Sequence, residues 1–426
     1  MTASATSGRR IFTISAIVTA IMLLAACGAG TPSPPAASPV LSKFERRTGD
    51  TVSRDCGYSS PLPGRPGWSM WLFCDTVVTG PGGQDSGGQD SGGHGSGGHG
   101  SSGQALRLIL GADTAAAGPY TPGQTPSALS EIPTPRQVPA VPPAAPWPDG
   151  GGPQPFTGVP ENLWLPGGAG PCVGPGAYPA AWISGVARAP ATAGGADLLI
   201  TFDDYCVTGG GGYEPEGFAI AEYDPAADVL SPPAPVFRGA AGGGTGGGAG
   251  GAAGGALPPW QVLGSPVVRG GYLYLFSSCR DVEWECGGVF VARVPAAHMS
   301  WRDPFAYQYW TGSGWSPRPA ASGSLLGRDR PLGISAGDFT ADGHGLVLIE
   351  QTSLAGDFSV WQAASPAGPW HRVRSGRVPC GKGTGHGAEE LCRALIGHAE
   401  LSTRESLLIS YFNPGTGHVD VSAYRW

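Results

Sequence analysis

The chain has 426 residues, of which 13% are charged, with 73 Gly, 43 Pro and a formal net charge of −7. This length allows a large hydrophobic core. The acidic balance and the absence of a basic patch in the sequence argue against nucleic acid or an acidic lipid surface as a partner.

The first 27 residues have the pattern of a bacterial export signal. Arg9 and Arg10 precede an apolar run that is short for a membrane-spanning helix, and the run ends in the sequence LAAC at Cys27. We therefore expect residues 1–27 to be a lipoprotein signal peptide and Cys27 to be the lipidated residue; an uncleaved anchor helix is the alternative. The arginine pair also resembles a twin-arginine signal, so the export route stays open.

Residues 28–50, rich in Ala, Pro and Ser up to Val40, are expected to form a flexible tether. The protein would then be anchored by lipid to the outer face of the cytoplasmic membrane. Residues 51–426 are expected to form a single domain with two Gly-rich inserts, at about 80–103 and 239–255. The first insert repeats GGQDS and then GGHGS. Neither insert offers enough apolar surface to offset its ordering entropy, so both are expected to be disordered loops.

The domain opens on an expected β-hairpin that carries Asp55 and Asp75, each beside a cysteine, Cys56 and Cys74. Its connection is rich in Pro and Gly, and its second strand is aromatic and β-branched. A Cys56–Cys74 disulfide would hold the strands together and bring both carboxylates near each other. Two interpretations stay open: a pair of catalytic acids, or a stapled hairpin at the start of an all-β domain.

Eight cysteines follow Cys27, and an even number in an exported chain indicates disulfides. Sequential pairing keeps each pair within one local unit, although many other pairings are allowed. The expected bonds are Cys56–Cys74, Cys172–Cys206, Cys279–Cys286 and Cys380–Cys392. No C-x-x-C motif or tight Cys/His cluster supports a metal site.

Short strand patterns punctuated by Gly and Pro fill the rest of the chain, without a convincing amphipathic helix. They are expected at 181–186, 197–202, 218–223, 266–268, 272–277, 289–294, 345–350, 358–363, 407–412 and 419–426. The strands form about five clusters, which predicts an all-β fold, a five-bladed β-propeller. The length and the number of clusters argue against the alternative, a two-sheet sandwich.

The segment from Asp55 to Thr76, ending in W-L-F-x-D-T, resembles a family of bacterial secreted proteins long filed as a domain of unknown function. Members have an aspartate before a Gly-rich turn and an aromatic strand ending in Gly-Asp-Thr, whereas this sequence has Cys74 in place of that Gly. Further segments resemble the same wider superfamily: GSPV with YLYLFS, SPAGPW, and YFNP to the final YRW. The resemblance implies a five-bladed propeller related to furanosidases, and some members are endo-D-arabinanases acting on mycobacterial-type arabinan.

Hydrolysis of a glycosidic bond needs two carboxyl groups on either side of it. Asp55 fits because it precedes an inner strand, where a propeller presents side chains to its channel. Asp75 is implied by the resemblance, and an Asp-Thr pair that satisfies a turn is the alternative. Glu216 and Glu400 are Gly-flanked or pre-strand carboxylates and are expected to support this pair.

We expect the substrate to be bound by residues near the channel and by aromatic rings that stack on sugar faces: His398, Asp338, Trp310 and Trp315. His398 could instead hold a central structural cation, or be a hydrogen-bonded turn histidine; no other cofactor is expected. The predicted function is hydrolysis of furanosidic, arabinan-type linkages in a polysaccharide of the cell wall or environment. The alternative is a non-catalytic propeller lipoprotein that binds glycan or protein.

Overall fold

The structure is a computed structural model, and the described residues are 38–39, 45–46, 50–79, 107–109, 113–126, 129–137, 156, 178–189, 198–207, 213–238, 255–256, 264–278, 288–297, 299–319, 322–327, 331–381 and 392–426. All of them belong to one compact unit, Pro34–Trp426. The expected signal peptide, Cys27 and nearly all of both Gly-rich inserts lie outside these ranges. No helix in the described ranges is long and apolar enough to cross a membrane.

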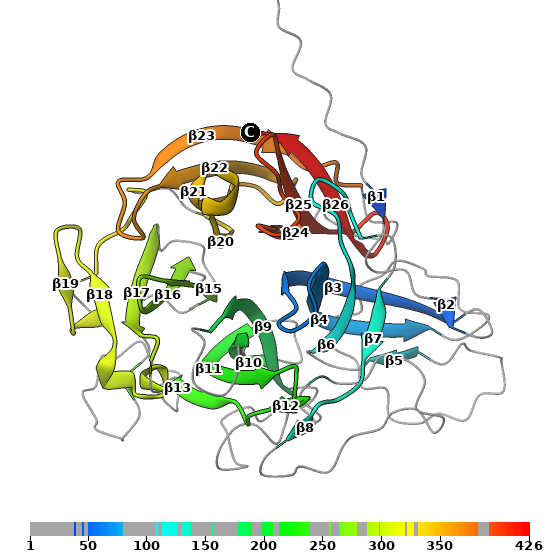
Figure 1. The fold of residues 1–426 in the computed structure, drawn as a ribbon, viewed down its shortest axis with the longest axis horizontal. Helices are drawn as coiled ribbons and strands as arrows, with labels where there is room; N and C mark the ends of the chain where they lie inside the picture. Colours follow the sequence, from blue (N-terminus) through cyan, green and yellow to red (C-terminus); the bar gives the residue numbers. More distant parts are fainter. Residues whose placement is uncertain are drawn as a thin grey trace, which may run out of the picture. The chain divides into compact units, whose positions relative to one another are not determined.

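Five β-sheets form the five blades of a propeller (Figure 1). Blade 1 contains β2 (Glu45–Arg46), β3 (Asp50–Pro61), β4 (Trp68–Thr79), β5 (Arg107–Ile109), β6 (Thr114–Pro119) and β7 (Ser130–Ile132). Blade 2 contains β8 (Arg136–Gln137), β9 (Tyr178–Arg188), β10 (Leu198–Val207), β11 (Tyr213–Asp224), β12 (Val229–Leu230), β13 (Ala234–Arg238) and β14 (Gly255–Ala256). Blade 3 contains β15 (Gly264–Arg269), β16 (Tyr272–Ser278), β17 (Val289–Pro295), β18 (Gln308–Trp310) and β19 (Trp315–Ser316).

Blade 4 contains β20 (Gly333–Phe339), β21 (Gly345–Gln351), β22 (Asp357–Ala363) and β23 (His371–Arg377). Blade 5 contains β24 (Arg393–Gly397), β25 (Ser406–Asn413), β26 (His418–Arg425) and β1 (Ser38–Pro39). Short 3₁₀ turns occur at η2 (Ser300–Arg302), η3 (Pro304–Ala306) and η5 (Thr340–Asp342). Every strand expected from the sequence overlaps an observed strand, and the five-bladed propeller is confirmed.

The inner strands of the blades form a closed ring. β3 contacts β9, β9 contacts β15, β15 contacts β20, β20 contacts β24, and β24 returns to β3. The last blade takes its outer strand, β1, from the start of the chain, where Ser38 pairs with Val421. The propeller therefore begins within the segment expected to be a tether, before the predicted boundary at residue 51, because β1 and β2 add edges to blades 5 and 1.

Polar contacts at two seams, between β15 and β20 and between β3 and β24, show that the inner strands on either side run in the same direction. Across the seam between β15 and β20, the hydroxyl of Ser265, near the start of β15, donates to the carbonyl of Ile334, near the start of β20. Arg269, at the end of β15, lies near Asp338, close to the end of β20. We call the end of the ring where the inner strands begin the leading end, and the end where they finish the trailing end. The second strand of each blade, β4, β10, β16, β21 and β25, is antiparallel and finishes at the leading end.

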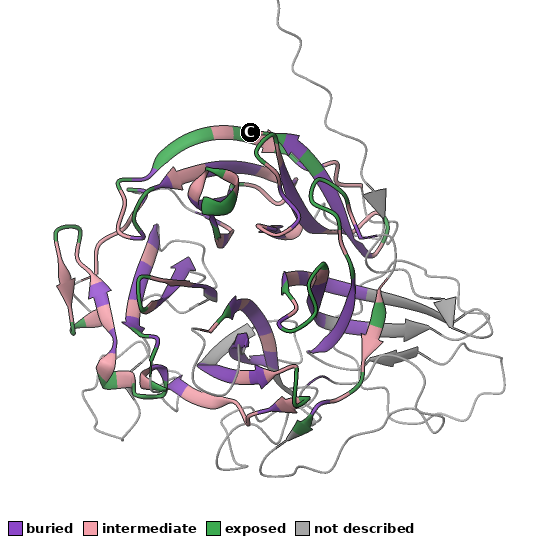
Figure 2. Cartoon of the chain, viewed as in Figure 1, coloured by how far each residue is buried: buried purple, intermediate pink, exposed green. Residues whose placement is uncertain are grey.

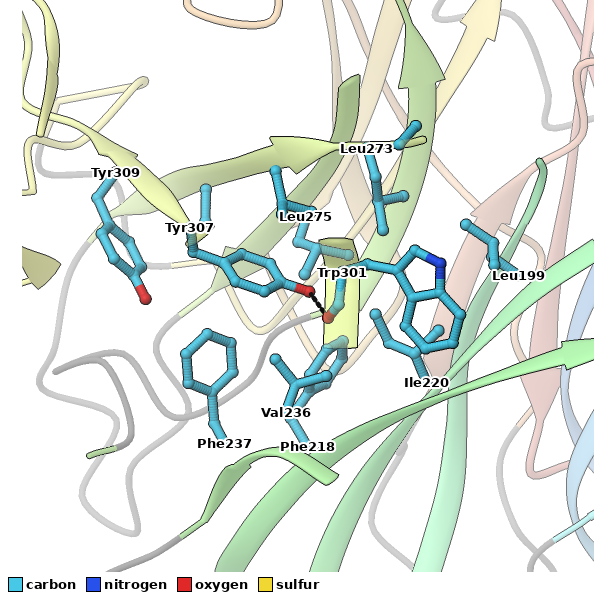
Figure 3. Close-up of a cluster of buried hydrophobic side chains, with 13 residues drawn as sticks. Leu199, Phe218, Ile220, Val236, Phe237, Leu273, Leu275, Trp301, Tyr307 and Tyr309 are labelled. Atoms are coloured by element: carbon cyan, nitrogen blue, oxygen red, sulfur yellow. Dashed lines mark hydrogen bonds between the residues drawn. The ribbon is translucent and has the colours of Figure 1, made fainter. Parts of the chain in front are cut away.

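Each of the five seams between blades encloses its own hydrophobic cluster. Between blades 2 and 3, for example, Trp301 and Tyr307 pack on Phe218 and Phe237, and the Tyr307 hydroxyl donates to the Trp301 carbonyl at 2.7 Å (Figure 3). The second strands are buried on both faces, as in β16, where only Tyr272 is half-buried. This is why the sequence shows continuous apolar runs there and not a strict alternation.

Candidate active site

Asp55 lies within β3, and not before the strand as expected, at the leading end and beside a distortion of the strand. The pairing with β4 shifts register on both sides of Cys56, and Cys56 and Gly57 have φ angles of 66° and 107°. A bulge of this kind re-aims the neighbouring side chains. The Cys56–Cys74 disulfide, with a Cα–Cα distance of 5.4 Å, ties the bulge to β4. The bulge and the disulfide together set the position of Asp55.

Both carboxylate oxygens of Asp55 accept hydrogen bonds. Arg393 Nε at the start of β24 donates to Oδ2 at 2.6 Å, and the Cys56 backbone N–H donates to Oδ1 at 2.7 Å. The side chains of Asp55 and Arg393 are 12% and 26% exposed, and the guanidinium lies 4.0 Å from the ring centroid of Phe412. A carboxylate held in this way is an acceptor, so it suits the role of base or nucleophile better than that of proton donor.

Further buried acids, which we did not predict from the sequence, lie at the leading end. Asp203 and Asp204 end the apolar part of β10, opposite Trp182 and Ala181 of β9, and are 6% and 9% exposed. Glu350 of β21, 2% exposed, accepts a 2.7 Å hydrogen bond from the indole of Trp361. The sequence does carry a signal for these acids, because each directly follows an apolar run, in LLITFDD and in LVLIE. Charged groups are rarely buried without a function or a partner.

The backbones of Asp75 and Glu216 also lie at the leading end. Asp75 follows Cys74 in β4, at the register shift opposite Asp55. Glu216 lies inside β11, next to Gly217, which pairs with Asp204, and not before the strand as expected. Both side chains lie outside the described part of the structure, so their catalytic roles stay predictions.

Glu400 and His398 lie at the trailing end, apart from Asp55. Glu400 accepts hydrogen bonds from the hydroxyl of Ser59 and, at 2.9 Å, from that of Ser69. Ser59 follows Asp55 by four residues along the same strand, which corresponds to on the order of 10 Å. Glu400 therefore contacts β3 further along the strand than Asp55, and its supporting catalytic role stays a prediction.

His398 is buried in the seam between blades 5 and 1. Its Nδ1 lies 2.6 Å from Ser59 Oγ, and its ring centroid is 4.6 Å from that of Trp71. Burial lowers the pKa of His398 to about 3, so the imidazole is neutral at ordinary pH. Because the Ser59 hydroxyl donates to the Glu400 carboxylate, His398 Nδ1 carries the proton and donates to Ser59. Burial also raises the pKa of Glu400, and the bonds from Ser59 and Ser69 oppose that rise.

The remaining predicted binding residues are dispersed. Asp338 lies near the trailing end of β20, with its carboxylate 3.5 Å from the guanidinium of Arg269. Trp310 and Trp315 lie in the outermost strands of blade 3, with ring centroids 5.5 Å apart, so they are not beside Asp55. In the described ranges no group of three or more His, Cys, Asp or Glu could hold a metal ion. A central cation therefore stays a prediction.

Two of the predicted disulfides are confirmed. Cys56 bonds Cys74, and Cys380 bonds Cys392 with a Cα–Cα distance of 6.1 Å. Cys206 is disulfide-bonded, whereas its expected partner Cys172 and both cysteines of the Cys279–Cys286 pair lie outside the described residues. Because Cys56 follows Asp55 and Cys392 precedes Arg393, each member of the ion pair has a disulfide next to it.

Residues 261–424, which cover blades 3 to 5, match the family described as Domain of unknown function (DUF5005). The chain is similar in structure to a GH43_1 enzyme from Xanthomonas citri complexed with xylotriose, with 10% identity, 92% of this chain and 90% of that chain covered, and a TM-score of 0.43. It is also similar to the endo-arabinase from Bacteroides thetaiotaomicron, with 10% identity, 91% and 97% covered, and a TM-score of 0.36. No curated protein matches the sequence. The activity is therefore argued from the residues of this chain.

Proposed function

We propose that the protein is a glycoside hydrolase that cleaves furanosidic, arabinan-type linkages in a polysaccharide. The observation that supports this most is Asp55, a partly accessible carboxylate held in an acceptor state at the leading end of the ring. The sequence resemblance to arabinan-cleaving propellers rests on the same segment.

The proposed roles follow from the hydrogen bonds. Asp55, whose oxygens only accept, would be the base or nucleophile. The proton donor has to be a second carboxyl group at the leading end. Asp75, implied by the resemblance, is the first candidate, and Glu216 supports the pair. The buried acids Asp203 and Asp204 are the candidates that the structure adds.

We also propose that the protein is a lipoprotein anchored at Cys27, exported to the outer face of the cytoplasmic membrane. The support is the signal pattern that ends in LAAC. A polysaccharide of the cell wall or environment would then be within reach of a tethered enzyme.

The alternative is a non-catalytic propeller that binds glycan or a protein partner. One observation favours it: the Asp55–Arg393 pair joins blade 1 to blade 5, so the same carboxylate could serve only to close the ring. The two functions differ in whether a linkage is broken.

The test is cleavage of purified arabinan, followed as release of reducing ends. Asp55→Asn should reduce kcat by at least 10²-fold, the lower bound for loss of a positioned base. Glu405→Gln, an exposed carboxylate at the trailing end, is the matched control and should retain cleavage. Asp75→Asn, Asp203→Asn and Asp204→Asn then show which acid is needed. If the unaltered, folded protein binds arabinan but releases no reducing ends, the hydrolase assignment is wrong and the binding function is favoured.

A further inference from the structure

Basic side chains from separate segments gather on blades 4 and 5. They are His371, Arg372 and Arg374 of β23, Arg404 of the turn between β24 and β25, and Arg425 of β26, and we call them the trailing rim. All are exposed except Arg374, which is half-buried. The Arg374 guanidinium donates to the carbonyl of Arg425 and so joins the two blades. The trailing rim is positively charged in a chain whose net charge is −7.

These charges are available for a partner. Within the described residues, no carboxylate forms an ion pair with Arg372, Arg404 or Arg425. Glu405 is the exposed acid that lies next to them in the sequence. Arg377, in contrast, forms a two-point pair with Asp357, at 2.6 and 2.9 Å, and is not included in the rim.

The trailing rim faces away from the candidate active site. Arg425 pairs with Ser406 at the start of β25, and Arg372 pairs with Trp361, on the trailing side of the Asp357–Arg377 pair. Asp55 lies at the leading end. Figure 1 shows β23, β26 and β1 in the same sector of the ring, and Figure 2 shows the exposed outer strand β23.

The start of the chain enters the propeller beside this rim. β1 runs antiparallel to β26, with Ser38 opposite Val421 and Pro39 opposite Asp420. The N-terminal end of β1 is therefore the end nearer Arg425. Cys27 precedes Ser38 by 11 residues (38 − 27), which fully extended span at most about 40 Å. A lipid on Cys27 would hold the membrane within that distance of Ser38.

We propose that the trailing rim docks on an anionic phospholipid surface, in contrast to the expectation from the sequence, in which these arginines are dispersed and form no patch. Guanidinium groups bind phosphate through paired hydrogen bonds, and each cation near an anionic surface adds to the attraction. Protection of an edge strand by charge would explain the arginines of β23 and also Arg425, because β1 pairs only with Asp420 and Val421 of β26. It would not explain Arg404, which lies in a turn. Docking in this way leaves the leading end directed away from the membrane. The proposal extends the proposed anchoring and is independent of hydrolysis.

The test compares binding of the full, unlipidated chain to two kinds of vesicle, pure phosphatidylcholine and an equal mixture with phosphatidylglycerol. The ratio of the two affinities removes any contribution of the apolar N-terminal run, which is common to both. The triple variant Arg372→Gln, Arg404→Gln, Arg425→Gln should lower this ratio on the order of 100-fold, because each cation contributes a factor of about five. High salt should lower it for the unaltered protein.

The matched control removes the same charge elsewhere, through Arg136→Gln, Arg302→Gln and Arg318→Gln, which are exposed arginines of blades 2 and 3. This control variant should bind with the same ratio of vesicle affinities as the unaltered chain. An equal loss in both triple variants would show that net charge alone governs binding and would overturn the proposal. So would an unchanged ratio in the rim variant. Binding of soluble polyglutamate by the rim, without preference for anionic vesicles, would assign the surface to an acidic polypeptide instead.

Discussion

Asp55 and Arg393 are 338 residues apart and meet at the seam where the ring closes. The sequence offers Asp55 as a candidate because of the hairpin around it, but gives no reason to select Arg393 among the arginines. The ion pair accounts for both the acceptor state of Asp55 and the contact of the first blade with the last. It is partly exposed, so screening by water limits its contribution to stability.

Arg393→Gln should therefore lower the unfolding free energy by about 1–2 kcal/mol, more than an exposed pair and less than a fully buried one. A double-mutant cycle with Asp55→Asn isolates the pair, because each variant removes the same interaction. Denaturant unfolding of the four proteins gives the coupling energy. Additive effects would show that the two side chains do not stabilise each other.

His398 should make the free energy of unfolding depend on pH in the acidic range. Its pKa is about 3 in the folded protein and 6.5 as the ordinary value, so the unfolded chain takes up the proton first. The stabilising contribution is complete above pH 6.5 and is lost as the pH falls toward 3, at about 1.4 kcal/mol per pH unit. His398→Gln should show a shallower fall of the unfolding free energy over this window.

Glu400 provides a control, because its titration should change the free energy of unfolding with pH in the opposite direction. Burial raises its pKa, so its contribution is present below the ordinary value of 4.5 and is lost as the pH rises through the folded pKa. Glu400→Gln should remove that loss at higher pH. If His398→Gln and the unaltered protein lose stability in parallel on acidification, the buried imidazole is not the cause.

Within elements, the β3–β4 hairpin combines a regular ladder with an irregular centre. The turn and both strands were predictable from Pro, Gly and aromatic spacing. The two register shifts around Cys56 were not, because they depend on the disulfide and on contacts with other blades: a Cβ on Gly57 would lie 3.0 Å from Val419 of β26. The second strands of the blades were also predictable only in part. Their apolar runs predict burial, but they do not predict which acid at the leading end faces the candidate active site.

Replacing Cys56 and Cys74 by Ser should lower the unfolding free energy by about 3 kcal/mol, from the loss of an 18-residue loop closure. Thermal unfolding measures this effect. The Cys380–Cys392 disulfide closes a 12-residue loop, so Cys380→Ser with Cys392→Ser should have a similar effect on stability. If the first pair is replaced without any change in the unfolding midpoint, the ladder alone holds the bulge.

On the scale of the whole molecule, stability depends on five seams that close a ring. Leu275→Ala in the seam of blades 2 and 3 and Leu408→Ala in the seam of blades 5 and 1 each remove a fully or almost fully buried side chain. Each should cost about 2–5 kcal/mol. Because an opened ring loses inner-strand contacts on both sides, we expect a single transition with coincident near- and far-UV circular dichroism. Separate midpoints for Leu408→Ala would show that the closing seam opens on its own.

The sequence by itself determined the all-β class, the five blades and the hairpin, because these follow from local periodicity and turn residues. It favoured the two confirmed disulfides but left other cysteine pairings open. Only the tertiary structure decided which residues share an end of the ring. It paired Asp55 with Arg393, placed Asp203 and Asp204 at the same end of the ring, and placed Glu400 and His398 further toward the other end. It also assembled a basic surface from arginines that are dispersed in the sequence. The reason is that a closed ring brings together residues of different blades, and no local pattern records that proximity.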